Sequence, residues 1–290
     1  AVNGMRQILW GLFKKIVIAD NCAEYANLIF NNSTDYSGST LVLGAIFFTF
    51  QIYGDFSGYS DIAIGTSRLF GFNLMRNFAF PYFSRDIAEF WRRWHISLST
   101  WFRDYLYIPL GGSRGGTLMK VRNTFIIFIV SGFWHGANWT FIVWGALNAI
   151  YFLPLLLTKN NRNHIEIVAK GKLLPTFRDT TLILITFGLT VFAWIFFRAE
   201  NMGHALQYIS DIFKHPGSFL LLGIYLKYKT ILILIGFLII IEWIGRENQF
   251  AIEGFTSNLP KYIRWSLYCV LSIIIFLYSG NQQDFIYFQF

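Results

Sequence analysis

The sequence is poor in charged residues, has two cysteines and has no internal repeat. Only 14% of its 290 residues are charged, whereas soluble domains contain about 25%. Together with 54% hydrophobic residues and a mean hydropathy of +0.45, this scarcity excludes an ordinary soluble domain. Long apolar runs between short polar loops predict instead an all-α, polytopic membrane helix bundle, because lipid cannot satisfy exposed backbone groups.

The cysteines and the basic residues exclude further classes of protein. Cys22 and Cys269 lie in apolar surroundings far apart in sequence, which fits neither a metal site nor a redox pair. The net charge of +8 comes without a Lys/Arg tract dense enough for nucleic acid, so we expect the basic residues beside membrane headgroups. The missing repeat argues against a two-fold transporter. We expect one membrane-embedded domain over 1–290, and the start at Ala1 favours a C-terminal portion of a longer chain.

Charge is mixed with apolar sequence in the first quarter of the chain. The segment Arg6–Phe30 has helical spacing but includes Lys14 and Lys15, and a charge at the membrane centre costs about 2.5–3.5 kcal/mol. We expect a tilted or interfacial helix whose lysines reach the headgroups. Downstream, Gln51–Gly65 carries acidic and polar residues within apolar sequence, which we interpret either as the wall of a substrate tunnel or as a structural hydrogen-bond network. These residues include Asp55, Ser57 and Asp61.

A basic, aromatic segment follows. From Arg76 to Arg122, eight basic and three acidic residues give a net charge of 8 − 3 = +5, which the positive-inside rule assigns to the cytoplasmic face. Between Phe90 and Tyr105, aromatic and leucine side chains recur on one helical stripe. His95 falls at the border between this stripe and a flank that includes Arg92 and Arg103. The pattern predicts one amphipathic helix at the level of the headgroups.

The apolar run Val121–Leu157 is too long for one membrane helix. A continuous helix of this length would reach roughly 55 Å, against a hydrocarbon core of about 30 Å. The Gly132–Gly136 pair around His135 is the expected break, and a broken helix at depth must lie within protein or beside a cavity. We therefore expect a re-entrant segment that carries His135 inside the membrane. Further membrane helices are expected over Asp179–Arg198, Thr230–Gly245 and Tyr262–Gly280.

The two histidines in these segments are the candidate catalytic residues. Purely structural roles stay open as alternatives: His95 could cap or anchor a helix, and His135 could be a core histidine bonded to a backbone carbonyl. Neither has another His, Cys or carboxylate at ligand spacing, so we expect no metal. Ser131 lies four residues before His135 on one helix face and permits a Ser–His nucleophile. Close helix packing explains a serine in a Gly-flanked membrane segment better.

Two long segments resemble one family of membrane enzymes, the membrane-bound O-acyltransferases. They are FAFPYFSRDIAEFWRRWHISLSTWFRDYLYIPLGGSR and SGFWHGANWTFIVWGALNAIY, and GLFKKIVIAD, YGDFSGYSDIAIG, VFAWIFFRAE and the terminal FIYFQF follow the same pattern in order. The bacterial alginate O-acetyltransferase branch is the most similar. The resemblance implies membrane helices around a tunnel that joins the two membrane faces. It also implies a catalytic His135 with an accompanying His95, and YIPLGGSR favours acetyl over D-alanyl transfer.

The activity that the resemblance implies is acyl transfer to a hydroxyl of a cell-surface polysaccharide, in the bacterial inner membrane. The donor would be acetyl-CoA or an acyl-carrier thioester from the cytoplasm, where arginines attract its phosphates. His135 would take the hydroxyl proton, and Asn138 would donate to the developing oxyanion. The expected partners are the surface glycan, the lipid bilayer and an extracytoplasmic acetyltransferase, with no bound cofactor and no nucleic acid. Weaker candidates for donor or substrate contact are Arg92, Arg93, Arg103, Asp55, Ser57 and Asp61.

Three alternatives stay open. The same fold can transfer D-alanyl or another acyl group. A transporter or flippase would use Asp55, Asp61 and His135 as a proton or lipid path. A catalytically silent scaffold for a periplasmic partner would tolerate replacement of both histidines. Turnover of a thioester donor by the purified protein separates the enzymes from the other two classes.

Overall fold

Helices make up all the regular structure of the residues that the structure describes. The structure is a computed structural model that describes residues 2–214, 217, 221–254 and 259–279. These residues contain no strand, which confirms the all-α prediction. Among them, four helices are long and apolar enough to cross a membrane: α3 (Gly38–Leu69), α7 (Trp139–Leu157), α8 (Phe177–Arg198) and the Lys227–Gly245 part of α10 (Leu221–Gly245).

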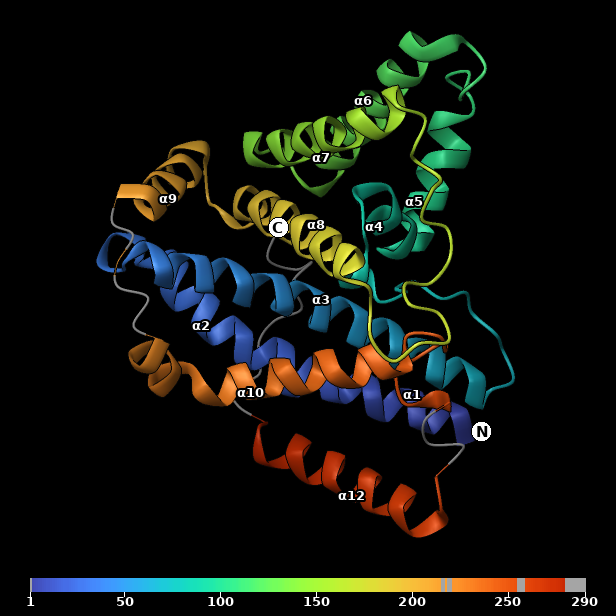
Figure 1. Cartoon of the computed structure of the whole chain (residues 1–290), viewed down its shortest axis with the longest axis vertical. Helices are drawn as coiled ribbons and strands as arrows, with labels where there is room; N and C mark the ends of the chain where they lie inside the picture. Colours follow the sequence, from blue (N-terminus) through green and yellow to red (C-terminus); the bar gives the residue numbers. More distant parts are fainter. Residues whose placement is uncertain (1, 215–216, 218–220, 255–258, 280–290) are drawn as a thin grey trace. The chain divides into compact units, whose positions relative to one another are not determined.

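The chain forms two compact units (Figure 1). The terminal unit combines Ala1–Arg76 with Tyr208–Phe290, and the central unit is Asn77–Gln207. Each unit has its own helical core, and a single domain over 1–290 stays a prediction. Besides α3 and α10, the terminal unit contains α1 (Val2–Leu12), the π-helix η1 (Phe13–Ala19), α2 (Asp20–Asn31), the short η2 (Ser33–Asp35) and α12 (Lys261–Leu277), and α9 (Met202–Lys214) runs across the boundary.

Glycines let α1 and α3 pack backbone to backbone in the terminal unit. The two helices are antiparallel, and Gly11 faces Gly58. A Cβ on Gly11 would lie 2.7 Å from the carbonyl oxygen of Gly58, and a Cβ on Gly58 would lie 2.8 Å from that of Gly11. Small residues at such crossings are a feature of membrane helix pairs, since close approach maximises van der Waals contact.

The two lysines of η1 are held inside this helix pair. The Lys14 side chain is 4% exposed, and its Nζ lies 2.7 Å from Asp61 Oδ2 and 3.0 Å from Ser57 Oγ. Lys15 Nζ lies 2.8 Å from both Asp20 Oδ1 and Asp55 Oδ1. The expectation that both lysines reach the headgroups is therefore wrong for Lys14. Carboxylates on α3 supply the partners that water or headgroups would otherwise supply, which makes the burial of both charges tolerable.

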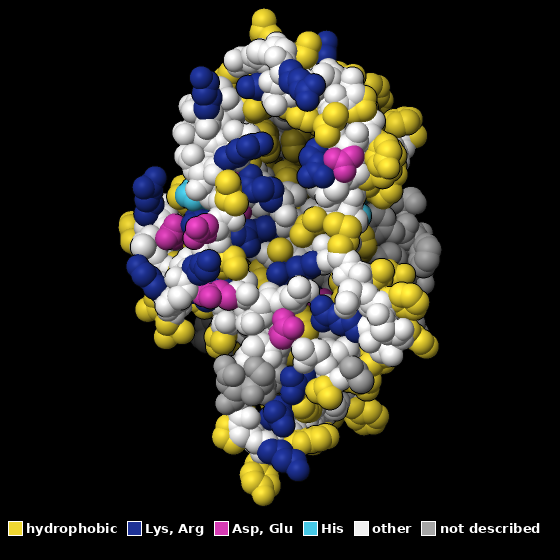
Figure 2. Space-filling view, turned by 90° about the vertical axis from the view of Figure 1, so that its right-hand side faces the viewer, with side chains coloured by type: hydrophobic (Ala, Val, Ile, Leu, Met, Phe, Trp, Pro, Cys, Tyr) yellow, Lys and Arg dark blue, Asp and Glu magenta, His cyan; other side chains and the backbone are white. Residues whose placement is uncertain are grey.

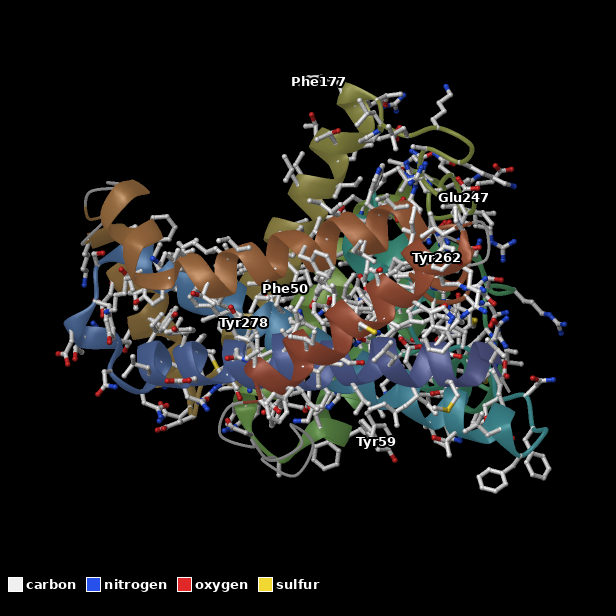
Figure 3. The ribbon with its side chains drawn as sticks, turned by 90° about the horizontal axis from the view of Figure 1, so that it is seen from below. Phe50, Tyr59, Phe177, Glu247, Tyr262 and Tyr278 are labelled. Atoms are coloured by element: carbon white, nitrogen blue, oxygen red, sulfur yellow. The ribbon has the colours of Figure 1, made fainter. Side chains whose placement is uncertain are left out.

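The C-terminal helix α12 packs beside α1 and η1. Figure 3 shows Tyr262 near its start and Tyr278 just beyond its end. The Asn21 side chain donates from Nδ2 to the carbonyl oxygen of Tyr278 at 3.1 Å, which ties the end of α12 to α2. The predicted helix over Tyr262–Gly280 is confirmed as a helix, although Gly280 and the terminal FIYFQF lie outside the described residues. Its membrane location stays a prediction.

The central unit is built around an antiparallel helix pair. Its elements are η3 (Pro81–Phe83), α4 (Ile87–Arg93), α5 (Ile96–Phe102), the π-helix η4 (Arg103–Tyr107), α6 (Gly116–His135), α7 and α8. The predicted break in the apolar run is confirmed: α6 ends at His135, and α7 begins at Trp139. Gly132 and Gly145 allow the two helices to touch, because a Cβ on either would overlap a carbonyl oxygen of the other helix.

Basic and apolar side chains share the face of the molecule that Figure 2 draws. On the face drawn in Figure 2, Lys and Arg side chains (dark blue) lie among hydrophobic ones (yellow), with fewer Asp and Glu (magenta). Basic residues next to exposed apolar ones are typical of proteins that contact anionic headgroups and acyl chains together. The surface therefore agrees with the membrane character of the long helices.

Candidate functional site

His135 lies in a box of aromatic rings in the central unit. It is the last residue of α6, where the chain turns toward α7. Its imidazole meets Trp144 of α7 and Phe197 of α8 edge to face, at centroid distances of 5.2 and 4.9 Å. Trp134 at 4.9 Å and Phe141 at 6.2 Å complete the box. Aromatic walls of this kind lower the local dielectric, which favours the neutral imidazole that can accept a proton.

Asn138 fixes the turn that presents His135. Its Oδ1 accepts a hydrogen bond from the Thr140 backbone N–H at 3.1 Å, which caps α7. Its Nδ2 donates to the carbonyl oxygen of Glu200 at 2.7 Å. The side chain is thus bound at both ends to backbone groups. The expected oxyanion role of Asn138 stays a prediction, and the contacts show a cap.

Behind the box, Asn148 orders the tryptophans. The Trp91 indole Nε1 donates to Asn148 Oδ1 at 3.1 Å, and Asn148 Nδ2 donates to the carbonyl oxygen of Trp144 at 2.9 Å. Trp91 also packs edge to face on Trp144 at 5.7 Å. A buried polar residue in an apolar helix is costly unless bonded in this way. We did not single out Asn148 from the sequence, although an asparagine within an apolar helix is a signal that could have identified it.

His95 interrupts the aromatic segment. It adopts a left-handed backbone with φ of 43° and starts α5, with its Nδ1 3.4 Å from the Leu98 N–H. The prediction of one continuous helix between Phe90 and Tyr105 is therefore wrong, since α4, α5 and η4 replace it. The reason is a long-range pairing: the N–H of Ile96 donates to the carbonyl oxygen of Asn77 at 2.9 Å, so the backbone here cannot continue α4.

The contacts of His95 favour one tautomer of its neutral ring. Nδ1 accepts from Leu98 and lies 3.3 Å from Ser97 Oγ, which leaves the proton of the neutral ring on Nε2. Burial lowers the pKa of His95 to about 4, because desolvation disfavours the charged ring. A non-glycine residue in the left-handed region is uncommon and strained, and such residues cluster at functional sites.

The two histidines belong to one cluster of the central unit. Their imidazoles lie within electrostatic range of each other. Aromatic rings connect them through successive contacts with centroid distances of 5.0 to 6.4 Å. From His95 to His135, the successive rings are Phe78, Trp94, Trp194 and Trp144.

Two of the three expected donor-binding arginines bind the loop that follows α7. Arg92 donates from Nη1 to the carbonyl oxygen of Asn161 at 2.8 Å and from Nη2 to that of His164 at 2.9 Å. Arg93 Nη2 lies 3.4 Å from the carbonyl oxygen of Glu166 in the same loop and 2.7 Å from Glu89 Oε1. Arg103, with a side chain that is 60% exposed, pairs with the neighbouring Asp104 at 2.7 Å. A role of these arginines toward the donor stays a prediction.

Glu89 holds two arginines of the central unit, and we did not single it out from the sequence. Its carboxylate is 1% exposed and pairs with Arg85 at 3.0 Å as well as with Arg93. Arg85 in turn donates from Nη2 to the carbonyl oxygen of Glu166 at 2.6 Å. The signal was the spacing of four between Glu89 and Arg93, which places these two on one face of α4. Arg85 lies four residues before Glu89, just ahead of the helix.

The remaining candidates lie in the terminal unit. Asp61 accepts from Gln7 Nε2 at 2.8 Å in addition to its ion pair with Lys14. Ser57 Oγ donates to the carbonyl oxygen of Tyr53 at 2.6 Å. Together with the pair between Asp55 and Lys15, these contacts are those of a network that joins helices. A substrate role for these three residues stays a prediction.

Known proteins share much of this sequence. The chain matches the family described as membrane-bound O-acyltransferase over residues 3–197. It is 36% identical over 300 residues to the peptidoglycan O-acetyltransferase of Helicobacter pylori, across 97% of this chain and 55% of the relative. It is 43% identical over 212 residues to the probable alginate O-acetylase of Pseudomonas aeruginosa, across 73% of this chain and 38% of the relative.

A third relative is named for a different activity. The chain is 36% identical over 168 residues to the teichoic acid D-alanyltransferase of Streptococcus thermophilus, across 53% of this chain and 40% of the relative. In all three comparisons the chain spans about half the length of the relative or less. The family match covers both histidines and reaches the last turn of α8. The chain belongs to the membrane-bound O-acyltransferase family.

Proposed function

We propose that this chain carries the catalytic centre of an O-acetyltransferase that modifies a cell-surface polysaccharide in a bacterial inner membrane. The observation that carries the proposal is the place of His135, at the end of α6 within an aromatic box drawn from three helices. The relatives named as O-acetylating enzymes support the acyl group and the kind of acceptor. The donor is proposed to be acetyl-CoA or an acyl-carrier thioester.

The proposed reaction uses His135 as a general base. The neutral imidazole takes the proton of the acceptor hydroxyl while the hydroxyl oxygen attacks the thioester carbonyl carbon. The carbon–sulfur bond then breaks, and the leaving thiolate takes the proton from the imidazolium. General-base help of this kind contributes about 10²–10⁴-fold to the rate. The ring returns to its neutral form after each transfer, so the reaction needs no added cofactor.

His95 is proposed to orient the donor. With Nδ1 accepting from Leu98, the ring presents an Nε2–H that can donate to a thioester carbonyl oxygen. Asn138 is proposed to position the His135 turn through its cap on α7. Arg103, the most exposed of the three candidate arginines, is proposed to attract donor phosphates. Arg92 and Arg93 are proposed to hold the loop from Asn161 to Glu166 near α4.

Donor turnover tests the proposal against its rivals. The purified chain, supplied with acetyl-CoA carrying a radiolabelled acetyl group and a soluble glycan acceptor, is expected to release free CoA and label the glycan. A transporter or a silent scaffold would show neither product. The contacts of Asp55 and Asp61, each ion-paired with a lysine, disfavour a proton path through these carboxylates. An extracytoplasmic partner is proposed as the protein that completes transfer to polymer in the cell. The soluble glycan acceptor takes the place of the polymer in this assay, so omission of the partner would leave both CoA release and glycan labelling intact.

A further inference from the structure

The indole of Trp194 holds a hydrogen-bond donor inside the central unit. Trp194 lies on α8 and is 2% exposed. Within the part of the chain that the structure describes, no acceptor lies in hydrogen-bond range of its Nε1. A buried N–H without a partner is uncommon, because it has lost its bonds to water without compensation. The Trp194 N–H is therefore a candidate for a group whose partner is a bound substrate.

Trp194 lies between the two candidate catalytic histidines in the aromatic cluster of the central unit. On one side its ring meets Trp94, the neighbour of His95 in sequence, at a centroid distance of 5.3 Å. On the other side it stacks on Trp144 at 5.7 Å, with the ring planes 20° apart. The Trp144 ring in turn meets His135 at 5.2 Å. The unpaired N–H thus belongs to the same cluster as the proposed general base.

A second unpaired polar group lies on the neighbouring helix, α7. The side chain of Thr140 is fully buried, and its Oγ1 meets no hydrogen-bond partner among the described residues. Thr140 lies four residues before Trp144, which places both side chains on one face of α7. Each of the two helices thus brings one unpaired polar group to this cluster. A purely apolar core would be more stable without either of them.

The cluster is accessible at the His135 end. His135 is half-buried, and Trp134 beside it is 52% exposed. Phe197 connects this end to the deeper ring, since it meets His135 at 4.9 Å and Trp194 at 5.0 Å between ring centroids. A small acyl group that enters beside His135 therefore comes within one ring of the Trp194 indole.

The position of Trp194, rather than the unpaired indole by itself, carries this inference. The indole Nε1 of Trp10 also meets no partner among the described residues, but Trp10 belongs to the terminal unit and stacks on Phe13. An indole N–H donates hydrogen bonds and accepts none. It can therefore stabilise a developing oxyanion without competing with His135 for the proton of the acceptor hydroxyl.

Resting on the proposed acyl transfer, we propose that Trp194 donates a hydrogen bond from Nε1 to the thioester carbonyl oxygen. As the acceptor hydroxyl attacks, this oxygen gains negative charge and the hydrogen bond strengthens. The indole N–H bond stays intact, and the proton of the hydroxyl still passes through His135 to the leaving thiolate. Because this interaction is strongest in the transition state, its loss lowers kcat more than it changes KM.

Acetyl transfer by the full chain tests this role, with radiolabelled acetyl-CoA and a soluble glycan acceptor. Trp194→Phe removes the N–H and is expected to lower kcat about 10²-fold, which is the effect of losing one hydrogen bond to an oxyanion. Trp10→Phe is the matched control, since it also removes a buried, unpaired indole N–H and the same ring volume. The control is expected to keep the parent kcat.

An isosteric replacement separates the hydrogen bond from the size of the ring. Benzothienylalanine has sulfur in place of the indole N–H and nearly the same shape. Replacement of Trp194 by benzothienylalanine, through nonsense suppression, is expected to lower kcat as far as Trp194→Phe does. A parent-like kcat in this variant would overturn the inference and leave the proposed function intact, because the ring alone would then suffice. A parent chain that transfers no acetyl group would overturn both.

Discussion

The close contact between α6 and α7 predicts that an alanine at Gly145 lowers both stability and activity. Gly145 lies one residue after Trp144, whose ring meets His135. In Gly145→Ala the new Cβ would overlap the carbonyl oxygen of Phe128, whereas an ordinary Cβ contact is 3.4–4 Å. Because protein interiors are close-packed, the helices would have to separate by on the order of 1 Å. The variant changes no group that touches substrate in the proposed reaction.

Two effects of known size follow from that separation. Overpacking of this kind costs about 1–3 kcal/mol of stability. A displacement of about 1 Å in catalytic geometry lowers a rate by about 10²-fold. We therefore expect Gly145→Ala to lower the thermal unfolding temperature in detergent and to reduce acetyl transfer about 10²-fold at saturating donor, with the larger change in kcat.

Gly188→Ala is the matched control for this prediction. Gly188 also lies within an apolar helix, α8, and a Cβ there meets nothing within 4 Å. An alanine at an open helical glycine stabilises by roughly 0.5–1 kcal/mol, so the control is expected to be at least as stable as the parent and equally active. The reasoning would be refuted if the two variants had the same stability and activity.

Three further predictions follow from buried contacts. Asn148→Ala removes the hydrogen bond to the Trp91 indole and is expected to lower the free energy of unfolding by about 1–3 kcal/mol. It is also expected to lower kcat with little change in KM. An unchanged kcat would exclude a positioning role for Asn148. Lys14→Met leaves the Asp61 carboxylate, whose side chain is 14% exposed, without its ion pair and is expected to cost at most about 3–5 kcal/mol in thermal unfolding. Most of this loss should be recovered in the double variant Lys14→Met with Asp61→Leu, and a double variant as unstable as the single one would contradict this. His95 is held neutral, with a pKa lowered to about 4 from 6.5 by burial, so the unfolded chain binds the extra proton and stability falls as pH drops from 6.5 to 4, by at most about 3 kcal/mol. His95→Asn, which tolerates the left-handed backbone, should show a flatter pH dependence in that window, and an unaltered slope would assign it to another group.

The sequence predicted the features that depend on local pattern. The length of the run Val121–Leu157 required a break, and α6 and α7 meet beside Gly136 as expected. The helix over Phe177–Arg198 also follows from apolar length alone. In both cases the lipid-length argument needs no knowledge of what the helix packs against.

Features that depend on distant partners could not be predicted in this way. The left-handed backbone at His95 follows from the hydrogen bond between the neighbouring Ile96 N–H and the carbonyl oxygen of Asn77. Nothing in the sequence pattern from Phe90 to Tyr105 indicates this hydrogen bond. The burial of Lys14 follows from Asp61 on another helix. The aromatic box of His135 takes Phe197 from α8, far along the chain, so the sequence indicated the histidine without its surroundings.

Replacement of the His135 imidazole tests the central claim most directly. His135→Asn and the control His164→Asn would be purified from membranes, matched for thermal unfolding and assayed for acetyl transfer from a radiolabelled thioester donor. We expect His135→Asn to lose at least 10²-fold of the rate, as removal of a general base requires, and His164→Asn to keep the parent rate. Full transfer activity in a folded His135→Asn protein would contradict the account.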